Sequence, residues 1–178
     1  MISTDLIAKC QKGDTNSQKS LFELTKAKMF GICLRFMDNK QDAEDILQEG
    51  YIKVFKEISK FRFEGNVEGW MRRIFVTTCL QALQTNKKII KSTFEFPEIS
   101  DDAIVEIDEN ESMGIKLIQL MHLMPVGFRT VLNLFVIEGK SHIEIAKLLG
   151  ISEGTSKSQL NRAKTYMRKL VETSFNVK

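Results

Sequence analysis

The chain has 178 residues, 43% of them hydrophobic, with only two prolines and ten glycines. This length fits one or two domains, and the scarcity of turn-forming residues favours long helices over a turn-rich β fold. The formal net charge of +3 is small. The charges nevertheless divide the chain into two basic bodies, residues 1–91 and 140–178, and an acidic strap, because residues 92–115 hold eight acidic and no basic residues. Basic bodies indicate a polyanionic partner.

The cysteines and histidines suggest neither a disulfide framework nor a metal site. Cys10, Cys33 and Cys79 are odd in number and widely spaced, so we expect small apolar helix residues in a reducing compartment. His122 and His142 have neither metal-ligand nor catalytic-triad spacing. The N-terminal residues lack the blocks of a signal peptide, and no apolar run approaches the roughly 20 residues of a membrane span. We expect a cytoplasmic protein with no membrane insertion, catalytic residue, metal or cofactor.

Hydrophobic periodicity predicts four helices in the first basic body. They cover residues 3–12, 17–36, 41–60 and 67–85. A break and a cap at Gly13–Asn16 separate the first two, and an aromatic loop at 61–66 separates the last two. In the third helix and just after it, the positions that we expect to face a core are Ala43, Ile46, Leu47, Val54, Ile58 and Phe61. The apolar or small positions of the fourth helix are Trp70, Met71, Ile74, Phe75, Thr78, Cys79 and Leu83.

The helix at 41–60 has an acidic and polar outer face inside a basic body. Asp45, Gln48 and Glu49 fall there, with Asp42 and Ile52 beside them. One interpretation is a solvated face near a helix N-terminus, where carboxylates are favoured. The other is a docking surface for a basic protein partner. The residue chemistry alone does not choose between them.

The loop at 61–66 leads into a basic helix. Aromatic side chains on which bases can stack, followed by cations that can follow phosphates, suit single-stranded nucleic acid. Here Phe61, Phe63 and Trp70 supply the rings, and Arg72 and Arg73 the charge. The alternative is that these rings simply close the core.

Residues 92–114 have no sustained period and contain Pro97, so they read as a flexible acidic linker. A helix is predicted to resume at Ile115. Met124–Pro125 breaks it, and Pro125 suits the first turn of a further helix that runs to Glu138 and ends at Gly139.

Residues 141–164 predict two helices separated by a three-residue turn. Ser141 and Glu144 form a capping box, Gly150 ends the first helix with positive φ, and Ser152 caps the second. In the second helix the expected inner stripe is Ser156, Leu160, Ala163, Met167 and Leu170, and the outer face carries Lys157, Ser158, Asn161, Arg162, Lys164 and Arg168. A short helix, a tight turn and a cationic, amide-bearing helix are typical of a helix-turn-helix that enters the major groove. An ordinary helical hairpin with a solvated basic face is the alternative.

Two blocks of residues together resemble a known family, the bacterial RNA polymerase sigma factors, specifically the extracytoplasmic-function (ECF) type of the sigma-70 family. The first comprises Asp42-Ala-Glu-Asp-Ile-Leu-Gln-Glu49, Phe61-Arg62 and Trp70-Met-Arg-Arg-Ile74. The second runs from Leu123-Met-Pro-Val-Gly-Phe-Arg129 through Glu138 to Ser158. The resemblance covers nearly the whole chain and implies an all-α fold of two small domains. It places a region 2-like domain at 1–91, the flexible acidic linker at 92–114, and a region 4-like helix-turn-helix domain at 115–178.

The resemblance also implies roles by position. Core RNA polymerase would bind Asp45, Gln48 and Glu49. A base flipped out of the −10 element, and the phosphates near it, would meet Phe61, Arg62, Phe63, Asn66, Trp70, Arg72, Arg73, Thr77, Lys87 and Lys88. Duplex −35 DNA would meet Ser152, Thr155, Lys157, Ser158, Asn161, Arg162, Lys164 and Arg168. Arg162 can read a guanine and Asn161 an adenine, and Gln159 is a further expected phosphate contact. The family makes an anti-sigma factor another expected partner.

Three positions depart from the pattern of many relatives. Thr77 replaces an Asn, Gln81 replaces an Asp or Asn, and Ser156 replaces a Val on the inner side of the recognition helix. A hydroxyl at Ser156 can bond back to the backbone four residues earlier.

Two rival functions remain open: a stand-alone helix-turn-helix regulator, which leaves the acidic face and the aromatic loop unexplained, and a sigma mimic that only titrates an anti-sigma factor.

Overall fold

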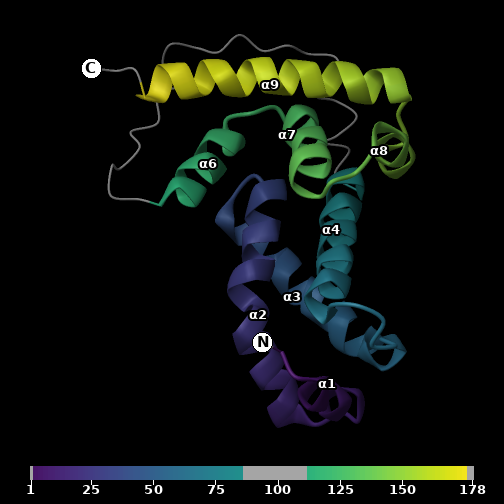
Figure 1. The fold of residues 1–178 in the computed structure, drawn as a ribbon. Helices are drawn as coiled ribbons and strands as arrows, with labels where there is room; N and C mark the ends of the chain where they lie inside the picture. The colour runs from purple at the N-terminus through teal and green to yellow at the C-terminus, as the bar shows by residue number, and fades with distance from the viewer. Residues whose placement is uncertain (1, 86–111, 176–178) are drawn as a thin grey trace. The chain divides into compact units, whose positions relative to one another are not determined.

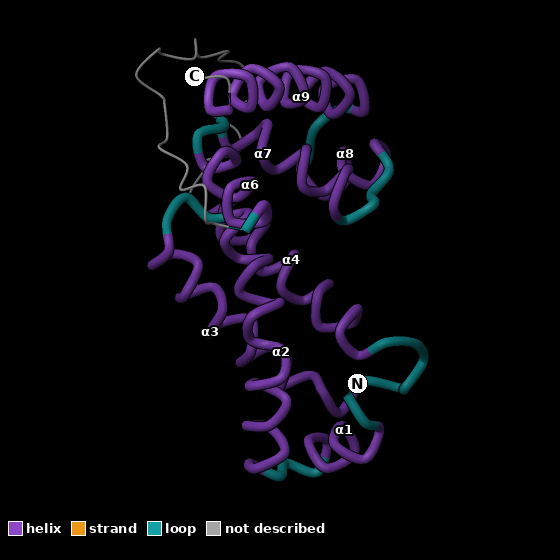
Figure 2. Tube along the Cα trace, turned by 60° about the vertical axis from the view of Figure 1, so that its left-hand side comes forward, coloured by secondary structure: helices purple, strands orange, loops and turns teal. Residues whose placement is uncertain are grey.

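The computed structural model describes residues 2–85 and 112–175, and all regular elements within these ranges are helices (Figures 1 and 2). The chain divides into two compact units, Met1–Ala82 and Leu83–Lys178. The all-α, two-domain prediction is confirmed. The expected linker at 92–114 lies almost wholly outside the described residues.

The N-terminal unit contains four helices, as predicted. They are α1 (Thr4–Gln11), α2 (Thr15–Phe36), α3 (Lys40–Glu57) and α4 (Val67–Thr85), and a 3₁₀ turn, η1 (Ile58–Lys60), extends α3. Side-chain caps fix the starts of the first three helices. Leu6 N donates to Ser3 Oγ (3.2 Å), Ser17 N to Asp14 Oδ2 (2.7 Å) and Asp42 N to Asn39 Oδ1 (2.8 Å). Each bond satisfies a backbone donor that the helix itself leaves unpaired.

The core of this unit is built around Tyr51 of α3. Its ring contacts Phe22 of α2, Phe55 one turn away and Phe75 of α4, at centroid distances of 4.7, 5.8 and 5.2 Å. Its hydroxyl lies 2.7 Å from Thr25 Oγ1. Burial of Ala43, Ile46, Val54, Ile58, Phe61, Met71, Phe75, Thr78 and Cys79 is confirmed. Leu47, Trp70 and Ile74 are only half-buried, whereas Gly50 and Tyr51, which periodicity did not select, are buried.

The C-terminal unit contains α6 (Met113–His122), α7 (Val126–Leu132), a π-helical segment η2 (Asn133–Ile137), α8 (His142–Leu149) and α9 (Glu153–Phe175). The expected continuous helix to Glu138 is therefore wrong in its second half, which is wound as a π segment. Pro125 lies just before α7 rather than within its first turn. The capping box of Ser141 and Glu144 and the positive φ of Gly150 (67°) are confirmed.

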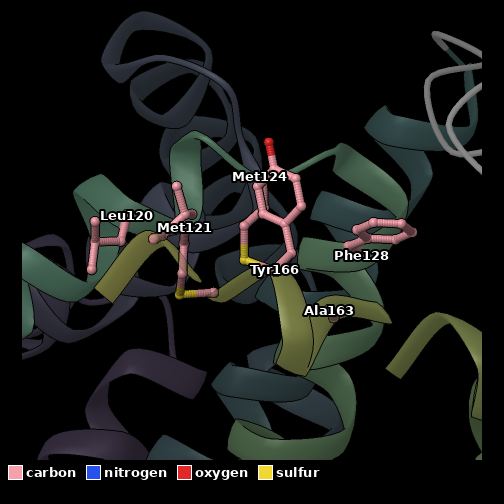
Figure 3. Close-up of a cluster of buried hydrophobic side chains, with 7 residues drawn as sticks. Leu120, Met121, Met124, Phe128, Ala163 and Tyr166 are labelled. Atoms are coloured by element: carbon pink, nitrogen blue, oxygen red, sulfur yellow. The ribbon is translucent and has the colours of Figure 1, made fainter. Parts of the chain in front are cut away.

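The core of the C-terminal unit gathers side chains from α6, the following turn, α7 and α9 (Figure 3). The cluster comprises Leu120, Met121, Met124, Phe128, Ala163, Tyr166 and Leu170. On α9, burial of Ser156, Leu160, Ala163 and Leu170 is confirmed. Met167 is half-buried, and Gln159 and Tyr166 are buried beside the predicted stripe. At 1% exposure Gln159 faces the core, so the expected phosphate contact from this side chain is wrong.

Candidate protein- and nucleic-acid-binding surfaces

The acidic face of α3 is exposed where the sequence placed it. Asp45, Gln48 and Glu49 are exposed, and Ile52 beside them is 67% exposed. These positions follow the spacing that places residues on one side of a helix, while Ala43 on the opposite side is fully buried. The exposed face thus combines carboxylates, an amide and one apolar side chain.

Lys53 joins this face to α4, which the sequence did not indicate. Its Nζ lies 2.7 Å from Glu49 Oε1. The same nitrogen donates to Gln81 Oε1 (2.9 Å) and to Thr78 Oγ1 (3.3 Å) of α4. Gln81, one of the three departures from the family pattern, is therefore tied to the helix that carries the acidic face. Only the three-dimensional packing of α3 on α4 reveals this contact.

The aromatic loop and the start of α4 line an open cavity of about 320 Å³. Trp70 stacks at a tilt on Phe61, with ring centroids 5.5 Å apart. Five predicted −10 residues line this cavity together with Lys60, Glu64, Gly65 and Gly69; the five are Phe61, Arg62, Asn66, Trp70 and Arg73. The cavity thus combines aromatic surface with cationic and amide groups, the chemistry that an unstacked base requires.

Two phenylalanines of this loop play different parts. Phe61 is 7% exposed and closes the core, whereas Phe63 is 43% exposed. Phe63 also has a positive φ of 59°, which is uncommon for a bulky residue and concentrates at functional sites. Asn66 Oδ1 accepts a bond from Glu68 N (2.9 Å) at the start of α4. Phe61 therefore follows the core interpretation, whereas the exposed Phe63 stays a predicted contact for nucleic acid.

The remaining predicted −10 residues do not line the same cavity. Arg72 lines a separate groove of about 490 Å³ between α2 and α4, shared with Arg35, which the sequence did not suggest. Thr77 is exposed farther along α4. Lys87 and Lys88 lie outside the described residues. Arg72 and Arg73 line different cavities because the side chains of consecutive helical residues point in directions about 100° apart.

The outer face of α9 is exposed along its length, at Lys157, Ser158, Asn161, Arg162, Lys164 and Arg168. Its start is ordered by Ser152 Oγ, which accepts from Thr155 N (3.0 Å) and lies 2.8 Å from Thr155 Oγ1. Lys157 Nζ lies 2.6 Å from Glu153 Oε1, and the bond from Lys157 lowers the pKa of the Glu153 carboxyl. A cationic helix with a capped N-terminus can meet both phosphates and base edges.

Ser156 bonds differently from the sequence-based expectation. Its Oγ lies 2.9 Å from Nδ1 of His142, at the start of α8. The backbone four residues earlier instead accepts the amide of Ser156, since Ser156 N donates to Ser152 O at 3.0 Å. The hydroxyl thus joins the two helices of the helix-turn-helix.

Within the described part of the chain, no group of histidine, cysteine and acidic side chains could hold a metal ion. No described helix is long and apolar enough to cross a membrane.

Comparisons with known proteins match both units of the chain. The family model for sigma-70 region 2 matches residues 21–89, and that for sigma-70 region 4 matches residues 115–167. The chain is 26% identical to the ECF RNA polymerase sigma factor SigW of Bacillus subtilis (strain 168), over 92% of this chain and 93% of that protein. It is also 26% identical to the ECF RNA polymerase sigma-E factor of Haemophilus influenzae, over 94% of each chain.

Two solved structures share the fold. The sigma factor RpoE, solved in complex with the anti-sigma factor NepR from Bartonella quintana, aligns with a TM-score of 0.54 and 18% identity over 86% of this chain and 96% of that one. CnrH, solved with the cytosolic domain of CnrY, aligns with a TM-score of 0.50 and 16% identity over 94% and 95%.

Two matched regions in this order, on two helical units, define the class of protein. The chain belongs to the sigma-70 family of RNA polymerase sigma factors. It is a promoter-recognition sigma factor of the ECF type. The alternative of a stand-alone helix-turn-helix regulator is not favoured, because region 2 has no place in it.

Proposed function

We propose that this sigma factor binds core RNA polymerase through the acidic face of α3, captures an unstacked −10 base at the aromatic loop, and reads the −35 duplex with α9. The carrying observation is the cavity of about 320 Å³ that gathers Phe61, Arg62, Asn66, Trp70 and Arg73. In this proposal residues 1–91 form the −10 and polymerase-binding domain, 115–178 the −35-binding domain, and 92–114 the connection between them.

Polymerase docking uses charge together with one apolar contact. Asp45 and Glu49 are exposed carboxylates on one side of α3, and Ile52 beside them is exposed. Such carboxylates steer a basic partner and fix its register, while an apolar side chain between them contributes burial. Glu49 already pairs with Lys53, so docking must exchange this ion pair for a cation of the polymerase.

The proposed −10 site requires unpaired DNA. Its side chains line a cavity in the protein, and a base that is still stacked in a duplex cannot enter it. A base enters such a site only after it has left the stack. The Trp70 ring offers a stacking surface worth roughly 1–3 kcal/mol per base. Arg62 and Arg73 supply donors and positive charge at the rim, and Phe63 stands exposed beside it. Arg72, Thr77, Lys87 and Lys88 are proposed to contact the strand outside this cavity.

The −35 site reads duplex DNA from α9. Arg162 and Asn161 are exposed on the outer face and match the bidentate patterns that read guanine and adenine in the major groove. Lys157 and Ser158 lie one turn earlier on the same face. The other predicted contacts hold phosphates and so set register rather than sequence; they are Ser152, Thr155, Lys164 and Arg168.

Partners and location follow from the family. RpoE and CnrH are each seen with a protein partner, named an anti-sigma factor in the case of NepR, and we propose that an anti-sigma factor also binds this chain. We place the protein in the cytoplasm, where polymerase and promoter DNA are. The chain itself carries no proposed catalytic residue or cofactor, since polymerase performs RNA synthesis.

Run-off transcription on genomic DNA fragments tests the proposal. Core RNA polymerase of the source bacterium is assayed with and without the full chain, and transcript starts are mapped. We expect new starts only when the chain is present, preceded by common −10 and −35 sequences. A chain that binds duplex DNA tightly without core enzyme, and adds no starts, would be a regulator instead.

The docking surface is tested by reversing its charge. Asp45→Arg should abolish co-purification with core polymerase, because it places a cation against a basic partner. Glu23→Lys is the matched control, since it reverses an exposed acid of the same unit on α2. Far-UV circular dichroism of both variants should equal that of the wild type. Normal co-purification of Asp45→Arg would contradict the docking assignment.

A further inference from the structure

His142 occupies a junction of three elements in the C-terminal unit. It is the first residue of α8, directly after the capping serine. Its ring stacks on Phe135 of η2, with centroids 4.6 Å apart and planes 25° apart. Its Nδ1 lies 2.9 Å from Ser156 Oγ in the first turns of α9. One imidazole thus contacts the segment before the helix-turn-helix and the helix after the turn.

The hydroxyl of Ser156 is buried and has this bond as its partner. The residue is 0% exposed and stands on the inner side of α9, where Leu160 and Ala163 are apolar. Its side chain is too small to fill space against α8 as a branched apolar residue would. A buried hydroxyl without a partner is costly, whereas a satisfied one fixes distance and direction. At this position a directional bond therefore replaces non-directional apolar packing.

The bond between His142 and Ser156 lies near the start of α9, and the later part of α9 is held by apolar packing. Farther along α9, Ala163, Tyr166 and Leu170 pack into the apolar cluster with α6 and α7. At the start, Leu160 of α9 is buried, as are Ile145 and Leu149 of α8, and Ser156 adds a polar bond between the two helices. If that bond is lost, the apolar cluster still holds the helix, but its first turns can shift. Lys157 and Ser158 directly follow Ser156, so a shift there moves DNA-facing groups first.

We propose that His142 is a positioning residue for promoter recognition: through Ser156 it sets the placement of the N-terminal turns of α9 on the −35 element. The inference rests on the proposed −35 function of α9. His142 itself touches no DNA in this scheme. Its effect is on sequence selectivity, because base-edge contacts tolerate displacement far less than phosphate contacts do.

The bond is tested first without DNA. The chain has two histidines, so a long-range proton–nitrogen spectrum contains two imidazoles, and His122→Phe identifies which is which. Ser156→Ala should change the Nδ1 signal of His142 and leave that of His122 unchanged. An unchanged His142 signal would overturn the proposal, since no bond would then exist in solution.

The positioning role is tested with the full chain in holoenzyme. The template is the strongest promoter mapped in the run-off experiment, paired with a copy whose −35 element is scrambled, and the measured quantity is the ratio of transcripts from the two. His142→Phe keeps a ring for Phe135 but loses Nδ1. We expect it, and Ser156→Ala, to lower the ratio roughly fivefold or more, because each variant removes one partner of the bond that places the first turns of α9.

A double variant separates positioning from simple destabilisation. In His142→Phe with Ser156→Val both polar partners become apolar, an exchange that can be nearly neutral, so the ratio should recover to within about twofold of the wild type. His122→Phe is the matched control and should keep the wild-type ratio. Single variants with wild-type selectivity, or a double variant worse than both singles, would overturn the inference alone. A wild-type chain that starts no transcripts would contradict the proposed function as well.

Discussion

The two units bury different chemistry between their helices. In the N-terminal unit the buried polar side chains are small hydroxyls, those of Ser17, Thr25 and Thr78. Thr25 and Thr78 donate to carbonyls of their own helices, at 2.7 and 2.9 Å. In the C-terminal unit the buried polar side chains include a guanidinium and two amides: Arg129, Thr130, Asn133, Ser156 and Gln159.

This difference separates two ways of specifying a core. Aromatic and aliphatic packing around Tyr51 is governed by volume and tolerates any neighbour of suitable shape. Buried polar groups demand particular partners at particular angles, and each one left unpaired is costly. The helix-turn-helix unit thus adds buried polar groups to its apolar cluster, and the bond of Ser156 to His142 joins two of its helices.

Of the substitutions that test the difference between the two cores, we expect the removal of Arg129 to cause the largest loss of stability. Arg129 is 1% exposed in α7, and truncating a buried charged side chain deprives its neighbours of their partner. We expect Arg129→Ala to lower the unfolding free energy of the C-terminal unit by roughly 2–5 kcal/mol, because a large buried side chain is removed and buried groups lose a bonding partner. Denaturant unfolding followed by far-UV circular dichroism measures the loss, while fluorescence of Trp70, the single tryptophan, reports the N-terminal unit. Arg162→Ala, an exposed arginine of the same unit, should leave both transitions in place.

If Arg129→Ala unfolds like the wild type, the buried guanidinium contributes nothing that its neighbours cannot replace. The proposed distinction between the two cores would then be wrong. If the Trp70 transition moves as far as the helical one, the two units do not unfold separately.

The same distinction explains what the sequence could predict. Local signals predicted α4 at Val67–Thr85 and the box of Ser141 and Glu144, because caps and glycine turns are decided within a few residues. The polar core escaped prediction: arginine and glutamine are normally exposed, so Gln159 was placed on the DNA side. No local pattern in the sequence marked the π segment Asn133–Ile137 either.

The candidate binding surfaces also include features that the sequence could predict and features that only the fold reveals. Helical periodicity was enough to place Asp45 and Glu49 on an exposed face, because one helix carries both. The cavity at Trp70 was predictable only in part, since its walls come from a loop and a helix that meet in the fold. The bonds from Lys53 to Gln81 and from His142 to Ser156 join different helices, and no spacing along the chain marks them.

Adding volume to the core of the N-terminal unit tests the other half of the comparison between the two cores. We expect a smaller loss of stability than for Arg129→Ala. A Cβ added to Gly50 of α3 would clash with the ring of Phe75, and Phe75 is fully buried. Gly50→Ala should therefore destabilise the N-terminal unit by roughly 1–3 kcal/mol, despite the better helix propensity of alanine.

Gly31→Ala on α2 is the matched control. Its Cβ would meet only Arg35 Nη1, at 3.9 Å, so it should stabilise the same unit by roughly 0.5–1 kcal/mol. Trp70 fluorescence during denaturant unfolding measures both variants. Equal effects of the two substitutions would mean that Phe75 moves aside freely, and that the volume of this core is not tightly specified.

The smallest predicted change in unfolding free energy comes from the ionisation of Tyr51. It is zero at neutral pH and appears only in alkaline solution. Burial raises the pKa of Tyr51 to about 12, although the bond to Thr25 opposes the shift. The fold thus favours the neutral phenol, and the stabilisation it provides is complete below the ordinary pKa of about 10 and is lost as pH rises through about 12. The unfolding free energy of the N-terminal unit, followed by Trp70, should fall across this window. Tyr51→Phe should flatten the fall, whereas Tyr166→Phe, in the other unit, should not. A fall that persists in Tyr51→Phe would assign the alkaline loss to other groups and leave the hydroxyl of Tyr51 no special place in this core.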